Sequence, residues 1–348
     1  MAQNTQEDAG LDWGHIGFGY VKTDYNVRCY YRNGKWGELE TTSDETITMH
    51  MAATILHYGQ GGFEGLKAYR GKDGKVRLFR PEENARRLNS TCDGIIMPQF
   101  PEEKFIEAIE KVVKLNKRFI PPYGYGATLY IRPFLFGCGP TVGVKPSPEY
   151  VFVVFVSPVG PYFKGGFATG DYMICREYDR SAPLGTGIYK VGGNYAASLK
   201  ANQKAHELGY MSEFYLDAKE KKYIDECGAA NFFGIKDNTY ITPKSTSILP
   251  SITNKSLMQL AEHLGMKVER RPIAEDELET FEEAGACGTA AVIAPIRKIV
   301  DTEKDKIYTI SKDGKPGKLS TKLYETYTAI QFGEQPDPFG WTRVIEGI

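Results

Sequence analysis

Two strongly apolar runs stand out in the first half of the chain. Residues 127–136 (ATLYIRPFLF) and 150–156 (YVFVVFV) are rich in aromatic and β-branched side chains, as is typical of buried strands. After Pro101, four apolar residues recur at helical spacing: Phe105, Ile109, Val112 and Val113. This spacing predicts an amphipathic helix, so a mixed α/β arrangement is expected in this half.

In the second half, short β-like segments alternate with helical ones. Strands are expected at 172–178, 212–218 and 221–226, followed by FFGI and TYIT around a turn at Asp237 and Asn238. A strand-rich core with peripheral helices is the predicted shape.

Three helices are expected to surround these strands. The first is capped by Asn194, runs to about Leu208 and stops at Gly209. The second opens at Thr253 and runs through Leu264 to Gly265, and the last covers 321–331.

A length of 348 residues favours two domains. Proline and glycine concentrate in SPVGPYFKGGFATG, residues 157–170, which is typical of a connecting segment. We expect an N-terminal domain over 1–160, a linker over 161–170 and a C-terminal domain over 171–348.

Composition narrows the class of protein. The 43 Lys and Arg nearly balance the 44 Asp and Glu, which argues against nucleic acid or an anionic membrane as a partner. No apolar run approaches a bilayer span, and the acidic, polar N-terminus resembles neither a secretory signal nor a transit peptide. Six scattered cysteines and five dispersed histidines offer no metal-ligand spacing. A soluble cytoplasmic protein without a structural metal is expected.

The most informative segment is GTGIYKVGGNYAAS, residues 185–198, in which Lys190 stands among apolar residues and glycines without a neighbouring acid. A lysine in apolar surroundings loses solvation of its ammonium form, so its pKa falls and its neutral amine can form a Schiff base. A solvated lysine in a glycine-rich loop would give the same pattern. The spacing is not GxGxxG, and no GxxxxGK[ST] occurs, so nucleotide binding has weak support.

The segments around and beyond Lys190 occur in a familiar order. They are KVGGNYAAS, YIDECGAANFF (223–233), SILPSITNKS (247–256) and ACGTAAVIAP (286–295). In the first half they are joined by HYGQGGFEGLKAYRG (57–71), RPEENARRLNST (80–91), LYIRP (129–133) and SPVGPYF (157–163). In these motifs the chain closely resembles the branched-chain amino-acid aminotransferases, class IV (fold type IV) enzymes that use pyridoxal 5'-phosphate (PLP).

The resemblance implies an α+β fold with a smaller N-terminal α/β domain and a larger C-terminal pseudo-barrel with peripheral helices. It implies reversible amino-group transfer between leucine, isoleucine or valine and 2-oxoglutarate, with glutamate and the 2-oxo acids as the other small-molecule substrates. Family members place the site between the domains and near a dimer interface, so a homodimer is expected.

The resemblance also assigns residues to the cofactor. Lys190 would form the Schiff base and move the substrate proton, and Glu226 would pair with the pyridine nitrogen, with Asp225 on the opposite strand face as its competitor. Tyr195 would hydrogen-bond the phenolic oxygen. The phosphate would be bound by four residues: Arg87, Ile252, Thr253 and Thr289. Arg86 is expected to face solvent.

The substrate pocket has to accept an aliphatic side chain in one half-reaction and a glutamate side chain in the other. The resemblance supplies Arg132 for the glutamate carboxylate and the Thr289 and Ala290 region for the α-carboxylate. Its aromatic wall candidates are Phe18, Tyr58, Phe63, Tyr130 and Tyr162.

The chain also departs from the family pattern. Ala291 and Ala294 stand where mammalian members carry a redox-active CxxC, and Ala229 replaces a threonine of those members. A dithiol switch is therefore not expected. Two alternatives stay open at this point: another class IV enzyme, such as a D-amino-acid aminotransferase or an aminodeoxychorismate lyase, and a nucleotide-binding module around Lys190.

Overall fold

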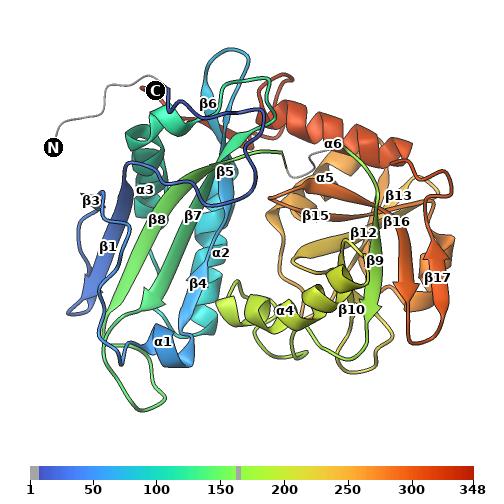
Figure 1. Ribbon diagram of the computed structural model, residues 1–348, viewed down its shortest axis with the longest axis horizontal. Coiled ribbons are helices and arrows are strands. Elements are labelled where there is room, and N and C mark those ends of the chain that lie inside the picture. The colour runs from blue at the N-terminus through green and yellow to red at the C-terminus, as the bar shows by residue number, and fades with distance from the viewer. Residues whose placement is uncertain (1–7, 162–165) are drawn as a thin grey trace. The chain divides into compact units, whose positions relative to one another are not determined.

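The computed structural model describes residues 8–161 and 166–348. The chain forms two compact units, one over Met1–Tyr162 with Ala329–Ile348 and the other over Phe163–Thr328. Figure 1 shows both units and labels most of their helices and strands. The last twenty residues thus belong with the N-terminal part of the chain, whereas the sequence placed them in the C-terminal domain.

The first unit is built on an antiparallel sheet whose described strands run in the order β18-β6-β5-β7-β8-β1-β2, with β3 on β1 and β4 on β7. Their bounds are β1 Asn26–Arg32, β2 Lys35–Trp36, β3 Glu40–Thr42, β4 Gly61–Phe63, β5 Leu66–Arg70, β6 Val76–Phe79, β7 Thr128–Gly137, β8 Tyr150–Val159 and β18 Thr342–Val344. The predicted strands at 127–136 and 150–156 are confirmed as β7 and β8, which pair along their full ten residues.

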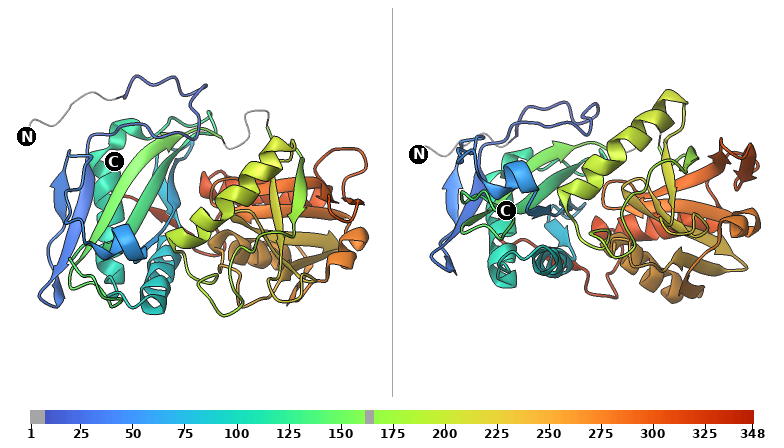
Figure 2. Two further views of the ribbon diagram at one scale, coloured as in Figure 1. Left: turned by 60° about the horizontal axis from the view of Figure 1, so that its bottom comes forward. Right: turned by 90° about the horizontal axis from the view of Figure 1, so that it is seen from below.

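Helices α2 Pro81–Gly94 and α3 Glu102–Leu115, with the short 3-10 turn η1 Lys117–Phe119, cover one face of this sheet. The short helix α1 Thr54–Tyr58 lies on the other face, where its Ile55 packs against Phe136 and Val151. The predicted amphipathic helix is confirmed as α3, whose Phe105, Ile109, Val112 and Val113 are all buried. Figure 2 shows α2 and α3 side by side against the sheet, where they enclose the main core of the unit.

The second unit contains a sheet that closes on itself. Its described strands run in the order β11-β10-β9-β16-β15-β12-β13-β14, and β11 also pairs with β12, which completes a barrel-like ring. The bounds are β9 Gly170–Cys175, β10 Ser212–Leu216, β11 Ile224–Cys227, β12 Ala230–Lys236, β13 Thr239–Pro243, β14 Lys267–Arg271, β15 Glu283–Gly288, β16 Val292–Asp301 and β17 Lys306–Thr309. Apolar side chains fill the interior of the ring. The predicted α+β class with a pseudo-barrel is confirmed.

The turn between β12 and β13 follows its sequence prediction. Asp237 and Asn238 both adopt left-handed backbone conformations, with φ of 48° and 54°. Two consecutive positive φ values are typical of the tightest hairpin turns, which favour Asn and Asp.

The helices of the second unit are α4 Gly192–Glu207, α5 Ile252–His263 and α6 Lys318–Gln331, with the 3-10 segment η2 Glu275–Thr280. Gly209 and Gly265 follow α4 and α5 with φ of 82° and 80°, as expected of left-handed stops. No helix of the described residues is long and apolar enough to cross a membrane.

Two predicted helix starts were wrong. Extended Val191 precedes α4, while Asn194 lies inside its first turn and donates its side-chain amide to the carbonyls of Thr186 and Tyr189. Asn194 therefore fastens the preceding loop and does not cap the helix. The cap of α5 is Ser251, whose hydroxyl accepts from the Asn254 amide, so the helix starts ahead of Thr253.

Candidate active site

Lys190 lies in the loop that leads into α4, and Tyr195 lies on the first turn of that helix. The Lys190 amine donates a hydrogen bond of 2.7 Å to the Tyr195 hydroxyl, and both side chains are partly buried. The amine also lies 5.0 Å from the centre of the Tyr195 ring. The position of the Lys190 amine is therefore fixed by its hydrogen bond to the Tyr195 phenol.

Glu226 lies on β11 and is 2% exposed. Its Oε1 accepts from the Asn231 side-chain amide at 2.7 Å and from the Leu249 amide at 3.1 Å. Burial raises the pKa of Glu226 to about 7, against the attraction of nearby Arg180 and Lys190. This is a carboxylate in an enclosed environment, facing hydrogen-bond donors.

The neighbouring Asp225 is also buried, and its Oδ2 accepts from the Ser247 hydroxyl at 2.6 Å. Burial raises the pKa of Asp225 above its ordinary value. The two adjacent carboxylates of β11 have separate partners, as alternation along a strand requires.

The candidate phosphate-binding residues of the second unit lie at the start of helix α5 and in the turn between β15 and β16. Ile252 and Thr253 are buried in the first turn of α5, where amides without helical partners meet the positive end of the helix dipole. Thr289 and Ala290 form the turn between β15 and β16 and are partly exposed. Val292, the first residue of β16 after this turn, has a φ of 63°, which is unusual for a β-branched residue.

In the first unit, Arg87 on α2 is paired with Glu64. The guanidinium donates through Nε and Nη2 to the two oxygens of a carboxylate that is fully buried, at 2.8 Å each. Asn84 donates to the same carboxylate at 2.7 Å. Arg86 points into solvent, as expected. Arg87 is thus oriented by its own unit through a bidentate pair.

The sequence-predicted wall residues of β4 and β7 form one cluster around Arg132. The Arg132 guanidinium lies 5.0 Å from the Phe63 ring and 5.2 Å from the Tyr130 ring, and its Nη2 donates to the Tyr130 hydroxyl at 2.9 Å. Phe18 packs edge-on against Tyr130, with ring centroids 5.5 Å apart. The buried Nε of Arg132 has no hydrogen-bond partner among the described residues.

Gly65 is required beside this cluster. A Cβ at that position would lie 2.3 Å from the Tyr130 hydroxyl. Any larger residue would displace the phenol that accepts from Arg132, which explains the glycine after Glu64.

Two predicted wall residues fall outside the cluster. Tyr58 ends α1 and is 43% exposed, and its hydroxyl bonds the carbonyl of Val142. Tyr162 lies outside the described residues. The structure therefore brings Phe18, Phe63, Tyr130 and Arg132 together in one unit, and Lys190, Tyr195 and Glu226 belong to the other.

Sequence reasoning missed three charged residues beside these groups. Glu64 and Lys67 belong to the quoted motif FEGLK, and Arg180 precedes the Lys190 loop. Lys67 pairs with Tyr130 across β5 and β7, and burial lowers its pKa to about 8. The sequence did contain a signal for Glu64 and Lys67: they are two charged residues within a segment that is otherwise typical of buried strands.

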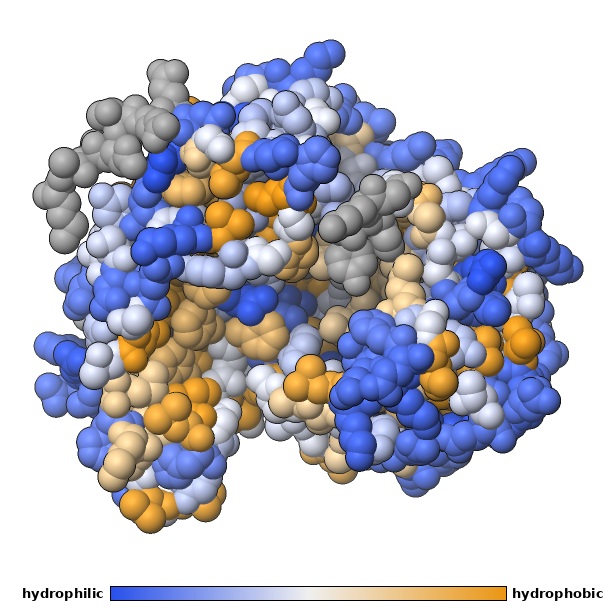
Figure 3. Space-filling model, viewed as in Figure 1, coloured by the Kyte–Doolittle hydropathy of each residue, from blue (hydrophilic) through white to orange (hydrophobic). Residues whose placement is uncertain are grey.

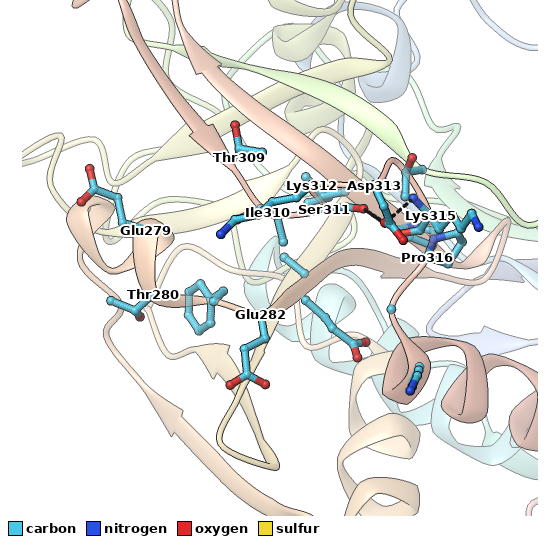
Figure 4. A pocket seen from close by; sticks show the side chains of 18 residues that line it. Glu279, Thr280, Glu282, Thr309, Ile310, Ser311, Lys312, Asp313, Lys315 and Pro316 are labelled. Carbon is cyan, nitrogen blue, oxygen red and sulfur yellow. Dashed lines mark hydrogen bonds between the residues drawn. The ribbon is translucent and has the colours of Figure 1, made fainter.

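Other hollows of the two units do not involve the predicted residues. A pocket of about 580 Å³ in the second unit (Figure 4) is lined partly by charged side chains of the 279–283 and 311–318 segments. Another, of about 420 Å³, lies in the first unit between Tyr25, Phe134 and Phe155. Across residues 8–161 and 166–348, no group of three or more His, Cys, Asp or Glu side chains is arranged to hold a metal.

Comparison with known proteins places these geometries in context. The family model described as "Amino-transferase class IV" matches residues 61–299. A branched-chain-amino-acid aminotransferase of Haemophilus influenzae is 50% identical over 343 residues, which cover 97% of this chain and 99% of that protein. The enzyme of the same name from Helicobacter pylori is also 50% identical, over 95% of this chain and 97% of that protein.

A solved structure agrees with the sequence comparison. The branched-chain amino acid aminotransferase of Escherichia coli matches with a TM-score of 0.78 at 28% identity, over 93% of this chain and all of that one. A second branched-chain amino acid aminotransferase, solved in complex with N-(5'-phosphopyridoxyl)-L-glutamate, matches with a TM-score of 0.77 at 27% identity, over 94% of this chain and all of that one.

Proposed function

Because this chain belongs to the class IV aminotransferase family, we propose that it is a branched-chain amino-acid aminotransferase that holds PLP on Lys190. The family match spans 61–299, and the bacterial relatives named for this activity are identical at half of their positions along nearly their full length. Its substrates are leucine, isoleucine or valine with 2-oxoglutarate, and the reaction is reversible. A nucleotide-binding module is set aside by the family.

The residues of the second unit fit PLP chemically. A primary amine, a phenol and a buried carboxylate occur together, and the amine already donates to the phenol at 2.7 Å. When bound, PLP supplies an electron sink for the carbanion formed at the substrate Cα. The observation that carries this proposal is the Lys190 amine held by Tyr195 in the same unit as buried Glu226.

Each of these side chains has a distinct task. The tethered Lys190 amine takes the proton from Cα of the donor amino acid and, in the second half-reaction, delivers a proton to Cα of the accepting 2-oxo acid, so proximity replaces a bimolecular encounter. The Tyr195 hydroxyl orients the amine and bonds the phenolic oxygen of the cofactor. Glu226 holds the proton on the pyridine nitrogen, because its negative charge stabilises the positive charge on that nitrogen, which a neutral amide would not do.

Positive and polar groups bind the phosphate. Arg87 supplies a guanidinium whose direction is fixed by buried Glu64. The first turn of α5, with Ile252 and Thr253, supplies backbone donors and a hydroxyl. Thr289 adds a further hydroxyl from the β15–β16 turn.

The substrate side chain binds against an apolar wall that contains one charged group, the guanidinium of Arg132. Phe18, Phe63 and Tyr130 form the wall for an aliphatic side chain. Arg132 binds the side-chain carboxylate of glutamate, and its guanidinium already lies beside the Phe63 and Tyr130 rings of this wall. The turn at Thr289 and Ala290 takes the α-carboxylate.

The enzyme works as a homodimer in the cytoplasm, with small molecules as its other partners. An exposed apolar patch supports self-association: Met51, Leu56, Tyr58, Val142 and Val144 are between 43% and 87% exposed. A backbone hydrogen bond from the Thr141 amide to the Ala52 carbonyl joins the two segments that carry these residues. Figure 3 shows hydrophobic residues gathered at the lower left, over the end of the unit that carries α1. All six cysteines are free, as a reducing compartment favours.

The proposal is tested by the purified protein with added PLP. Borohydride reduction followed by peptide mass mapping should attach the cofactor to Lys190. A panel of L-leucine, L-isoleucine, L-valine and D-alanine with 2-oxoglutarate should show turnover with the three branched-chain substrates. Attachment elsewhere, or turnover with D-alanine alone, would overturn it.

A further inference from the structure

Arg180 is a buried arginine directed at the carboxylate of Glu226. It is 7% exposed and lies in the segment between β9 and α4. Its Nε forms an ion pair with Oε2 of Glu226. Its Nη1 donates to the carbonyls of Ser247, at 2.9 Å, and Gly187, at 3.4 Å. The guanidinium is thereby fixed from two loops while it faces Glu226.

The partners of Glu226 are all hydrogen-bond donors. Oε1 receives the Asn231 side-chain amide and the Leu249 amide, and Oε2 faces the guanidinium of Arg180. A protonated carboxyl would have to donate, and none of these three groups accepts. The local geometry therefore favours the ionised form of Glu226.

Burial opposes that form. Desolvation is the main cause that raises the pKa of Glu226, the adjacent carboxyl of Asp225 adds to it, and the net pKa is about 7. The opposing charges are Arg180 and, with a smaller effect, Lys190. With its pKa near neutrality, a further loss of positive charge would leave Glu226 protonated under physiological conditions.

The other titratable groups around Glu226 do not supply a counter-charge. Cys227 on β11 and Cys287 on β15 are buried thiols whose pKa values are raised by burial, so they stay neutral. Glu213 on the neighbouring β10 is buried and accepts from Asn202 and Ser212. Arg180 is consequently the principal group that compensates the buried charge of Glu226.

We propose that Arg180 is a positioning residue that keeps Glu226 ionised and oriented, so that Glu226 can hold the proton on the pyridine nitrogen. This inference rests on the proposed role of Glu226, because Arg180 acts through that carboxylate. Arg180 contacts the carboxylate directly, so its charge stabilises the carboxylate more than it repels a protonated pyridine beyond it.

The first test needs no cofactor. The carboxyl of Glu226 is titrated by 13C NMR in the apo enzyme labelled at glutamate, and its signal is assigned by its loss in Glu226→Gln. In Arg180→Met the midpoint should rise by at least one pH unit, and in Arg180→Lys it should rise less. Arg176→Met is the matched control, because Arg176 is a partly buried arginine of this unit that pairs with Glu275 and Asp301. An unchanged midpoint in Arg180→Met would overturn the inference.

The second test links Arg180 to the reaction. In PLP-loaded Arg180→Met, the rate of the leucine half-reaction at pH 7 should fall roughly tenfold or more, because most of Glu226 is then protonated. The rate should recover as the pH is raised, so the acid limb of the profile moves to higher pH. A uniform loss at every pH would indicate a structural role and overturn the inference.

These outcomes are separate from failure of the proposed function. If wild-type protein did not attach PLP at Lys190, the proposed function would fail while the apo titration still decided the Arg180–Glu226 coupling. If Arg180→Met failed to fold, Arg180→Gln would carry both measurements, because its amide can still donate to the Ser247 carbonyl.

Discussion

In the proposed function the amine of Lys190 serves both as nucleophile and as proton carrier, and its hydrogen bond to Tyr195 fixes its starting position. Lys190→Ala should therefore abolish transamination, with a loss of roughly a thousandfold or more from removing nucleophile and base together. Phosphate and ring contacts should still retain PLP. Turnover with leucine and 2-oxoglutarate is the measurement, and a variant that kept a tenth of the wild-type rate would contradict the assignment.

Arg132 is the residue expected to distinguish glutamate from leucine. In Arg132→Met, glutamate would bring a carboxylate into an aromatic cluster without its partner, at a cost of about 2 to 5 kcal/mol. Leucine has no such group to lose. Single-turnover rates for glutamate should thus fall steeply, while the leucine half-reaction changes much less.

The control for Arg132 is an arginine of the same unit that has a structural partner. Arg118 is paired with Asp24 through two bonds of 2.7 Å, so Arg118→Met should leave the ratio of the two half-reactions unchanged. An unchanged ratio in Arg132→Met would mean that another residue reads the glutamate carboxylate.

Candidate site residues could be named from the sequence where they belong to a recognisable motif. They could not be named where only a contact between distant parts of the chain brings them to the site. Lys190, Glu226 and Arg87 stand in motifs that the sequence displays. Glu64 and Arg180 became visible only through contacts across 23 and 46 positions of chain. Their charges look ordinary in one dimension, because burial and pairing are properties of the fold.

Strand β11 carries two adjacent buried carboxylates, Asp225 and Glu226. Because Glu226 titrates differently in the folded and unfolded chain, the stability of the protein depends on pH. The pKa of Glu226 is about 7 when folded, above its ordinary value of 4.5, so the folded protein binds more protons between these limits. The free energy of unfolding should therefore fall as the pH rises from about 4.5 to 7, by up to about 3 kcal/mol from this residue. Below pH 4.5 the contribution of Glu226 to the free energy of unfolding is fully present.

Urea unfolding of the apo enzyme at pH 5 and pH 8 measures this dependence. Glu226→Gln should remove that part of the pH dependence, since an amide does not titrate. Equal pH dependence in the variant and wild type would show that Glu226 titrates normally when folded.

Ser251 is the N-cap of helix α5, and its hydroxyl accepts from the Asn254 amide at 3.2 Å. Ser251→Ala should lower the free energy of unfolding by about 1 kcal/mol, the usual cost of losing an N-cap. Thr326→Ala is the control, because that exposed hydroxyl bonds within α6 and caps nothing. Denaturant midpoints compare the two variants, and equal midpoints would argue against a capping role.

Elements with a strong periodicity were predicted well, and their starts were not. The helix α3 and the strands β7 and β8 follow from spacing and composition. The cap of α4 was misassigned because an Asn amide serves equally well to fasten a loop, and Asn194 does so. Which backbone groups a short polar side chain reaches is decided by the fold around it.

The arrangement of the chain into units exceeds what local patterns can predict. β18 pairs with β6, more than two hundred and sixty positions earlier, and so returns the C-terminal residues to the first sheet. The closing pair of β11 with β12 is similarly invisible to periodicity, which reports faces and not partners. The resemblance to a known family supplied the barrel, and the spacing alone would not have done so.

Self-association is expected to depend on the exposed patch of Met51, Leu56, Tyr58, Val142 and Val144. Val142 and Val144 are 82% and 87% exposed in the single chain, which is a large apolar exposure for neighbouring residues of one loop. If a second copy covers them, a carboxylate placed there would be buried without a partner. Each such change should cost about 2 kcal/mol, or roughly thirtyfold in the dimer dissociation constant.

Sedimentation equilibrium of wild type, Val142→Asp and Val144→Asp measures this effect. Ile307→Asp is the matched control, because Ile307 is 58% exposed on β17 and lies outside the patch. The two patch variants should dissociate at concentrations where wild type and the control remain dimers, with unchanged circular dichroism. A monomeric wild type would refute the homodimer itself. Dimers of equal strength in all four proteins would place the interface on another surface, because a buried carboxylate could not be tolerated without cost.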